Sequence, residues 1–87
     1  MYYVYIIESK IDSSYYIGYT NDIQRRLEGH NRGQTRSTRS KKPWKLKYYE
    51  VIENKTDALK REKFLKRQKN REFYKKLFNN WFGSSVG

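Results

Sequence analysis

The chain has 87 residues, which is enough for one domain with a single hydrophobic core and too few for a second domain or a large cofactor cage. It carries 20 Lys+Arg against 9 Asp+Glu, and its formal net charge of +11 favours a polyanionic partner, because such a surface otherwise repels itself. It has no cysteine and one histidine, which excludes disulfides, thiol catalysis and a zinc site with the usual Cys or His count.

Aromatic residues make up 17% of the chain, whereas hydrophobic residues reach only 36%. Tyr, Phe and Trp side chains each bury a large area, so we expect a folded domain despite the charge. No apolar run approaches the roughly 18 residues that would span a bilayer, and the N-terminal segment is typical of a strand rather than a signal peptide. We therefore expect a cytoplasmic protein with no membrane partner.

The N-terminal half predicts two strands and a helix. Tyr2–Ile7 reads YYVYII, which is apolar on both faces like a buried central strand. Tyr15–Tyr19 reads YYIGY and follows a polar turn too short for a parallel crossover, so we expect an antiparallel pair. Gly18 within this strand indicates a bulge or the close approach of another group. A helix then begins after the capping residues 20–22 and ends before Gly33.

The C-terminal half predicts a loop, a strand and two helices. Arg32–Pro43 contains no apolar residue and forms a basic loop, and Trp44–Glu53 alternates well enough for a third strand. Asn54 and its neighbours cap a helix that reaches about Lys69. Asn70 then starts a last amphipathic helix.

These elements follow one another in the order β-β-α-β-α-α. They predict an α/β (α+β) fold with a small three-stranded antiparallel sheet flanked by helices. We expect a single domain over residues 1–82 and a flexible tail over residues 83–87, which read GSSVG.

The first helix carries a charged residue on its apolar side. Ile23, Leu27 and His30 follow the i, i+4, i+7 spacing of an inward stripe, and Arg26 lies on the same stripe. An inward Arg26 must find an anion or hydrogen-bond acceptors, because a buried unpaired charge is costly. Alternatively, Arg26 snorkels to solvent or pairs with Asp22 at i−4. The spacing alone leaves both interpretations open.

The second helix shows the same pattern with the opposite sign. Glu62 lies near Ala58 and Leu65 on one stripe, in a segment otherwise crowded with Lys and Arg. It could equally form an ordinary ion pair with Lys66 at i+4 or with Lys69 nearby.

Tyrosines form the third notable group. Tyr3 and Tyr5 share one face of the first strand, and Tyr16 could oppose either of them, depending on the register. A tyrosine in a small core is usually a packing residue with a satisfied hydroxyl. Two phenols that converge with an arginine, a histidine and a glutamate would instead offer a proton acceptor, a cation for phosphate charge and a metal ligand. These are the groups that metal-assisted phosphodiester hydrolysis needs.

In this order the residues resemble the GIY-YIG nuclease domain. The resemblance rests on Tyr3-Val4-Tyr5 and Tyr16-Ile17-Gly18, followed by Arg26, His30 and Glu62, and it covers about residues 2–78. The chain is most similar to small stand-alone bacterial proteins related to the nuclease half of an excinuclease. Its first motif reads YVY instead of GIY, but only the last tyrosine of that motif is expected at the site.

The resemblance implies one divalent ion, Mg²⁺ or Mn²⁺, held by Glu62. It implies that Tyr5 and Tyr16 line the site, and we expect Tyr16 to help deprotonate the attacking water. Arg26 would stabilise charge on the phosphate, and His30 would orient a tyrosine hydroxyl or assist proton transfer. Many relatives carry an asparagine near the site on the last helix, and the candidates here are Asn70, Asn79 and Asn80.

We therefore expect a divalent-metal-dependent endonuclease that cuts DNA with little intrinsic sequence specificity, in repair or recombination, with a protein partner that supplies target choice. The alternative is a non-catalytic basic nucleic-acid-binding module on the same fold. RNA stays open as a ligand because no 2′-OH reader is identifiable, and a ribosome-associated role would show as RNA preference. The expected backbone contacts are Arg32, Arg36, Arg39, Lys41 and Lys42 in the basic loop, with Lys66 and Lys69 on the second helix.

Overall fold

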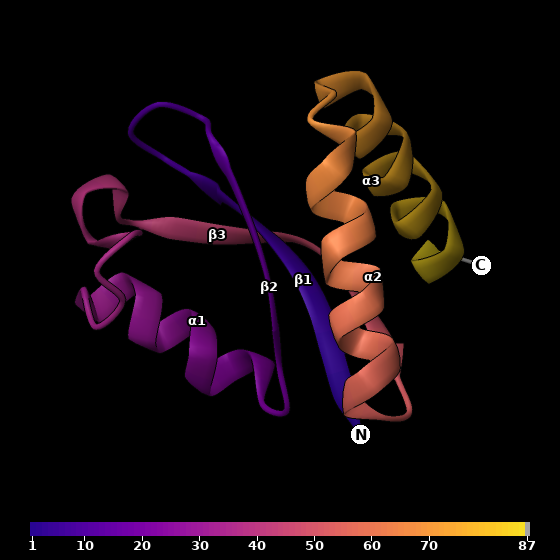
Figure 1. The fold of residues 1–87 in the computed structure, drawn as a ribbon. Coiled ribbons are helices and arrows are strands. Elements are labelled where there is room, and N and C mark those ends of the chain that lie inside the picture. The colour runs from indigo at the N-terminus through magenta and orange to yellow at the C-terminus, as the bar shows by residue number, and fades with distance from the viewer. Residues whose placement is uncertain (87) are drawn as a thin grey trace.

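The structure, a computed structural model, describes the backbone of residues 1–86 and the side chains of residues 1–79. Among the described helices none is long and apolar enough to cross a membrane. The elements confirm the predicted order β-β-α-β-α-α (Figure 1). They are β1 (Tyr2–Ser9), β2 (Tyr15–Thr20), α1 (Ile23–Arg32), the 3₁₀ turn η1 (Arg39–Lys41), β3 (Trp44–Ile52), α2 (Lys55–Gln68) and α3 (Arg71–Val86).

The sheet has three antiparallel strands in the order β2-β1-β3, as the sequence predicts. β1 is the central strand, and its residues from Val4 to Ile7 are all buried. Burial on both faces explains why this segment is apolar at every position instead of alternating.

The register of β1 and β2 corrects one expectation. Tyr16 opposes Ile7, while Tyr5 opposes Gly18, so Tyr16 faces neither Tyr3 nor Tyr5 directly. The reason is the turn that joins the strands, which is closed by a hydrogen bond from the Ser9 N–H to the Ser14 carbonyl and so sets the pairing. Tyr16 is instead the diagonal neighbour of Tyr5 on the same face.

The two faces of the sheet are covered by different helices. Val4 and Ile6 belong to the hydrophobic cluster under α2 and α3, whereas Tyr5 and Ile7 belong to the cluster under α1. Figure 1 shows α1 on one side of the strands and the α2–α3 pair on the other. The sheet therefore separates two small cores.

The helix ends match the predicted caps. The Asp22 carboxylate accepts the Arg25 N–H at the start of α1, and Gly33 ends that helix with a φ of 80°. The Asn54 side chain caps α2 in the same way by accepting the Asp57 N–H.

The last helix is long. α3 continues to Val86, so its backbone is helical beyond Phe82, and the expected end of the domain at residue 82 stays a prediction. Each residue added to an existing helix gains a hydrogen bond, which offsets the weak helix propensity of Gly and Ser. Gly87, the end of the expected tail, lies outside the described residues.

Candidate active site

The hydroxyl of Tyr5 joins three of the predicted site residues. Its oxygen lies 3.0 Å from Nε2 of His30 and accepts a hydrogen bond from Nε of Arg26 at 3.3 Å. Tyr5 is 3% exposed and His30 is fully buried. The structure thus brings Tyr5, Arg26 and His30 into direct contact, although they come from a strand and two turns of a helix.

Burial controls the charge of this group. Burial raises the pKa of Tyr5 to about 12, and the Arg26 hydrogen bond offsets only part of that effect. Burial, with the nearby charge of Arg26, lowers the pKa of His30 to about 4. At neutral pH Tyr5 is therefore a protonated phenol and His30 a neutral imidazole.

Gly18 makes room for the Tyr5 phenol. A Cβ on residue 18 would lie 2.7 Å from the Tyr5 hydroxyl oxygen and 3.2 Å from a ring carbon of Tyr16. The pairing of β1 with β2 is regular at this point. Of the two explanations that the sequence offered for this glycine, close approach is therefore the correct one.

Tyr16 is the more accessible of the two phenols. Its ring lies 6.5 Å from that of Tyr5 and 5.0 Å from that of His30, between centroids. It is half-buried and lines a cleft between β2 and α2 together with Lys66 and Lys69. Tyr16 therefore borders both the buried group and an open, basic cleft.

Arg26 lies at the rim of the site, and of the interpretations that the spacing left open it follows the one in which the side chain snorkels to solvent. The residue is exposed, and its side chain lines a second cleft that includes Thr20, Asn21 and Lys55. A long arginine side chain can start on an inward stripe and still carry its guanidinium to the surface. The Tyr5 hydrogen bond raises the pKa of Arg26, so the guanidinium stays charged.

Glu62 combines both of the interpretations that the sequence left open. Its carboxylate lies 3.7 Å from the Lys66 ammonium, the expected i, i+4 ion pair, yet its side chain is only 14% exposed. Its charge also contributes to raising the pKa of Tyr5, so the carboxylate is within electrostatic range of the phenol. Glu62 is thus a shielded carboxylate near the tyrosine group and not a group in bulk solvent.

A single carboxylate suits one kind of metal site. No group of three or more His, Cys, Asp or Glu side chains that could hold a metal occurs among the described residues. Mg²⁺ keeps several waters and is often bound by one or two carboxylates together with substrate phosphates. Glu62 therefore fits the ion that the resemblance implies, with substrate and water as the remaining ligands.

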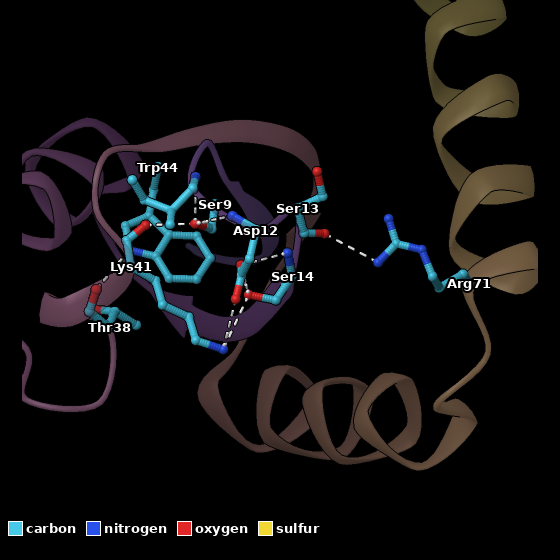
Figure 2. Close-up of polar contacts among 9 residues, drawn as sticks. Ser9, Asp12, Ser13, Ser14, Thr38, Lys41, Trp44 and Arg71 are labelled. Carbon is cyan, nitrogen blue, oxygen red and sulfur yellow. Dashed lines mark hydrogen bonds and ion pairs between the residues drawn. The ribbon is translucent and has the colours of Figure 1, made fainter.

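The basic residues expected to contact nucleic acid divide into two groups. Lys41 is half-buried, and its ammonium lies 3.3 Å from the Asp12 carboxylate and 3.4 Å from the Ser14 hydroxyl (Figure 2). Its main-chain carbonyl accepts a hydrogen bond from Ser9 at 2.6 Å. Lys41 thus ties the basic loop to the β1–β2 turn. The other expected contacts are exposed: Arg32, Arg36, Arg39, Lys42, Lys66 and Lys69.

Thr38 is a site residue that the sequence did not reveal. Its hydroxyl oxygen lies 2.8 Å from Nδ1 of His30, and its main-chain carbonyl accepts the indole N–H of Trp44 at 2.9 Å. Nothing in the basic loop distinguishes it from Thr35 or Ser37, because its burial depends on how the loop folds against α1 and β3.

The structure describes the side chains of two of the three candidate asparagines. Asn70 caps α3, because its side-chain oxygen accepts the Glu72 N–H at 2.9 Å. Asn79 is exposed, and the side chain of Asn80 lies outside the described ones.

These features define a small α+β domain with a buried tyrosine–histidine pair, a rim arginine and one shielded carboxylate. A family model described as the GIY-YIG catalytic domain matches residues 1–77, and the chain belongs to this family, whose members are typically nucleases.

Individual relatives are similar over most of the chain. The chain is 44% identical over 68 residues to the UPF0213 protein CPE1444 of Clostridium perfringens, and the match covers 77% of this chain and 72% of that protein. A UPF0213 protein of Halobacterium salinarum is 43% identical over 63 residues, with 71% and 80% covered. The solution NMR structure of the UPF0213 protein BH0048 from Bacillus halodurans is similar with a TM-score of 0.53 at 35% identity, covering 86% of this chain and 81% of that one.

Proposed function

We propose that the protein is a divalent-metal-dependent endonuclease that hydrolyses phosphodiester bonds in DNA with little intrinsic sequence specificity. One observation carries the proposal: the Tyr5 hydroxyl bonds to both His30 and Arg26 within electrostatic range of the shielded Glu62. A purely binding surface has no need for a buried phenol between an imidazole and a guanidinium. Phosphodiester hydrolysis uses a fixed cation beside a proton acceptor. The bonded group accounts for the fixed cation, and the adjacent Tyr16, whose ring lies 6.5 Å from that of Tyr5, is the candidate acceptor.

We assign the removal of the water proton to Tyr16. The Tyr5 hydroxyl already has two partners and a pKa of about 12, so it is a poor candidate for this step. Tyr16 is the more accessible phenol and borders the cleft lined by Lys66 and Lys69, where a substrate phosphate can approach it. In this step Tyr16 first gives its own phenolic proton to solvent, and the phenolate then takes a proton from the water as the water oxygen attacks phosphorus. The bond from phosphorus to the leaving oxygen breaks, and that oxygen is protonated from solvent.

Arg26 supports the phosphate as charge develops on it. Its Nε is fixed by Tyr5, while the residue as a whole is exposed toward the cleft with Lys55. A guanidinium held in place before the reaction loses little energy to reorganisation, which makes such a contact effective in the transition state. Tyr5 and His30 thus act by holding Arg26.

Glu62 is the residue that would hold the metal ion. When bound, Mg²⁺ or Mn²⁺ supplies Lewis-acid polarisation of a phosphoryl oxygen and neutralises part of its charge. With one ion instead of two, more of the transition-state charge falls on Arg26.

The exposed basic residues would hold the DNA backbone through counterion release. If about five phosphates are neutralised, the logarithm of affinity should fall with the logarithm of salt concentration with a slope of about −4.5. No helix of the described part presents an evident base-reading face, so we expect a protein partner to supply target choice in repair or recombination.

A plasmid assay tests the proposal. Purified protein is incubated with supercoiled plasmid and Mg²⁺ or Mn²⁺, beside the variants Glu62→Gln and Tyr16→Phe. We expect the wild type to nick and both variants to lose nicking while they keep salt-sensitive DNA binding. Glu72→Gln, an exposed carboxylate at the start of α3, is the matched control and should nick normally. A wild type that nicks with neither ion, or a Glu62→Gln protein as active as wild type, would leave only a nucleic-acid-binding module.

A further inference from the structure

Thr38 is the one buried residue of the basic loop, residues 32–43, whose other residues are exposed or half-buried. It is 1% exposed, and its hydroxyl has two partners, Nδ1 of His30 at 2.8 Å and the Thr35 carbonyl at 3.3 Å. A threonine hydroxyl has one proton to donate, and a carbonyl oxygen can only accept. The hydroxyl proton can go to Thr35 or to Nδ1, and the Tyr5 hydroxyl decides between them. Among the described contacts the Tyr5 proton has an acceptor only at Nε2 of His30, so the ring proton is on Nδ1 and the Thr38 proton goes to Thr35.

This direction fixes the tautomer of the imidazole. A neutral histidine carries one N–H, so protonation at Nδ1 leaves Nε2 as a bare acceptor. Tyr5 must then donate its hydroxyl proton to Nε2, which lies 3.0 Å away. The Tyr5 oxygen keeps its lone pairs for the Arg26 Nε–H at 3.3 Å.

The hydrogen bonds thus all point the same way, from Arg26 through Tyr5 and His30 to Thr38 and the Thr35 carbonyl. The position of Thr38 is also fixed by a contact outside these hydrogen bonds. Its carbonyl accepts the Trp44 indole N–H at 2.9 Å (Figure 2). Trp44 is itself buried. Thr38 is therefore held in place independently of its hydrogen bond to His30.

We propose that Thr38 is a positioning residue that sets the His30 tautomer and, through Tyr5, the placement of the Arg26 guanidinium. Without the hydroxyl, His30 is free to carry its proton on Nε2. The Tyr5 oxygen would then face two donors, His30 and Arg26, and its own proton would have no buried acceptor. The effect of Thr38 on DNA cleavage rests on the proposed function, whereas the assignment of the His30 tautomer is independent of that function.

Nitrogen NMR on the histidine-labelled protein tests the tautomer directly, because the chain has one histidine. At pH 7 we expect the wild type to carry its ring proton on Nδ1 with Nε2 unprotonated. Thr38→Ser keeps the hydroxyl and should keep this pattern. Thr38→Val keeps the shape and removes the hydroxyl, and it should lose the preference for Nδ1–H. The neighbouring exposed residue provides the control, Ser37→Ala, which should behave as wild type.

Plasmid nicking by the same variants tests the functional consequence. We expect Thr38→Val to lower kcat roughly tenfold with KM unchanged, and Thr38→Ser to restore it, because the loss of one hydrogen bond of this kind is worth about that factor. A residue with only a structural role would lower the amount of folded protein without shifting the tautomer.

The outcomes separate the two proposals. A wild type with its proton on Nε2, or a Thr38→Val protein that keeps both Nδ1–H and full kcat, overturns the role of Thr38. If Thr38→Val does not fold, the wild-type and Thr38→Ser spectra still decide. A wild type with the expected tautomer that nicks no DNA contradicts the proposed function and leaves the tautomer assignment standing.

Discussion

The Tyr5 hydroxyl lies directly over Gly18, its partner across the β1–β2 pair, at a distance that leaves no room for a side chain. The phenol cannot move aside cheaply, since its oxygen is bonded to His30 and its ring is buried in the core under α1. The site therefore depends on residue 18 having no Cβ.

Gly18→Ala should displace the Tyr5 phenol. We expect the free energy of unfolding to fall by about 1–3 kcal/mol, as for other overpacked positions, and nicking to be lost. Urea denaturation and the plasmid assay measure the two effects. Gly29→Ala is the control, because a Cβ there meets only the flexible end of Gln34 and a helix interior favours alanine by about 1 kcal/mol. Equal effects of the two substitutions would contradict this interpretation of Gly18.

Acid should destabilise the fold through His30. Its pKa is near 6.5 in an unfolded chain and about 4 in the folded protein, so between these pH values the unfolded state binds more protons. The free energy of unfolding therefore rises with pH across this window. As the pH falls from about 7 to about 4, it decreases by roughly 3 kcal/mol.

Urea unfolding at a series of pH values measures this slope, with His30→Gln as the comparison. The variant should show a shallower dependence between pH 4 and pH 6.5, since no other histidine is present. Hydrogen bonds from Ser14 lower the pKa of Asp12 to about 2, so protonation of Asp12 destabilises the fold only below the pH range in which His30 titrates. An unchanged slope in His30→Gln would mean that His30 is not the titrating group.

The expected DNA contacts should differ in their salt dependence. Lys41 already pairs with Asp12, whereas Lys69 is exposed beside the Tyr16 cleft. We expect Lys69→Ala to reduce the slope of log affinity against log salt by about 0.9, the value for one phosphate contact, and Lys41→Ala to reduce it less. Fluorescence anisotropy with a short duplex between 50 and 200 mM salt, roughly the range where such contacts change affinity most, measures both. A larger effect of Lys41→Ala would place the DNA over the β1–β2 turn.

Asn31 should be important for stability at the end of α1. Its side-chain amide accepts the Trp44 N–H and donates to the Trp44 carbonyl at 3.1 Å, which joins the helix to the start of β3. Asn31→Ala leaves both main-chain groups without this partner, so we expect a loss of about 1–3 kcal/mol in urea denaturation. The exposed Gln24→Ala on the same helix should stay within about 0.5 kcal/mol of wild type. If the two variants are equally stable, this bridge contributes nothing.

Local patterns were sufficient to predict most of the fold. The caps at Asp22 and Asn54, the stop at Gly33 and the central position of β1 depend on neighbours in the chain, so their residue types identify them. The approach of Arg26 and His30 to Tyr5 follows from helical spacing together with the family resemblance.

Other features depend on contacts between distant segments. The diagonal placement of Tyr16 depends on how the β1–β2 turn closes, and the exposure of Arg26 depends on how far its side chain extends from α1. The role of Thr38 depends on Trp44, which fixes the loop against the sheet. Lys41 looks like any other basic residue until the fold brings it to Asp12.

The separation of the molecule into two cores has a consequence for how such a site evolves. Glu62 belongs to α2, which packs on one core, whereas Tyr5 belongs to the other core. Their relative placement therefore depends on how both cores pack on the sheet. Gradual repacking of one core would therefore disturb the alignment of the proposed site well before it prevented folding, so a chain could lose the proposed reaction and keep the domain.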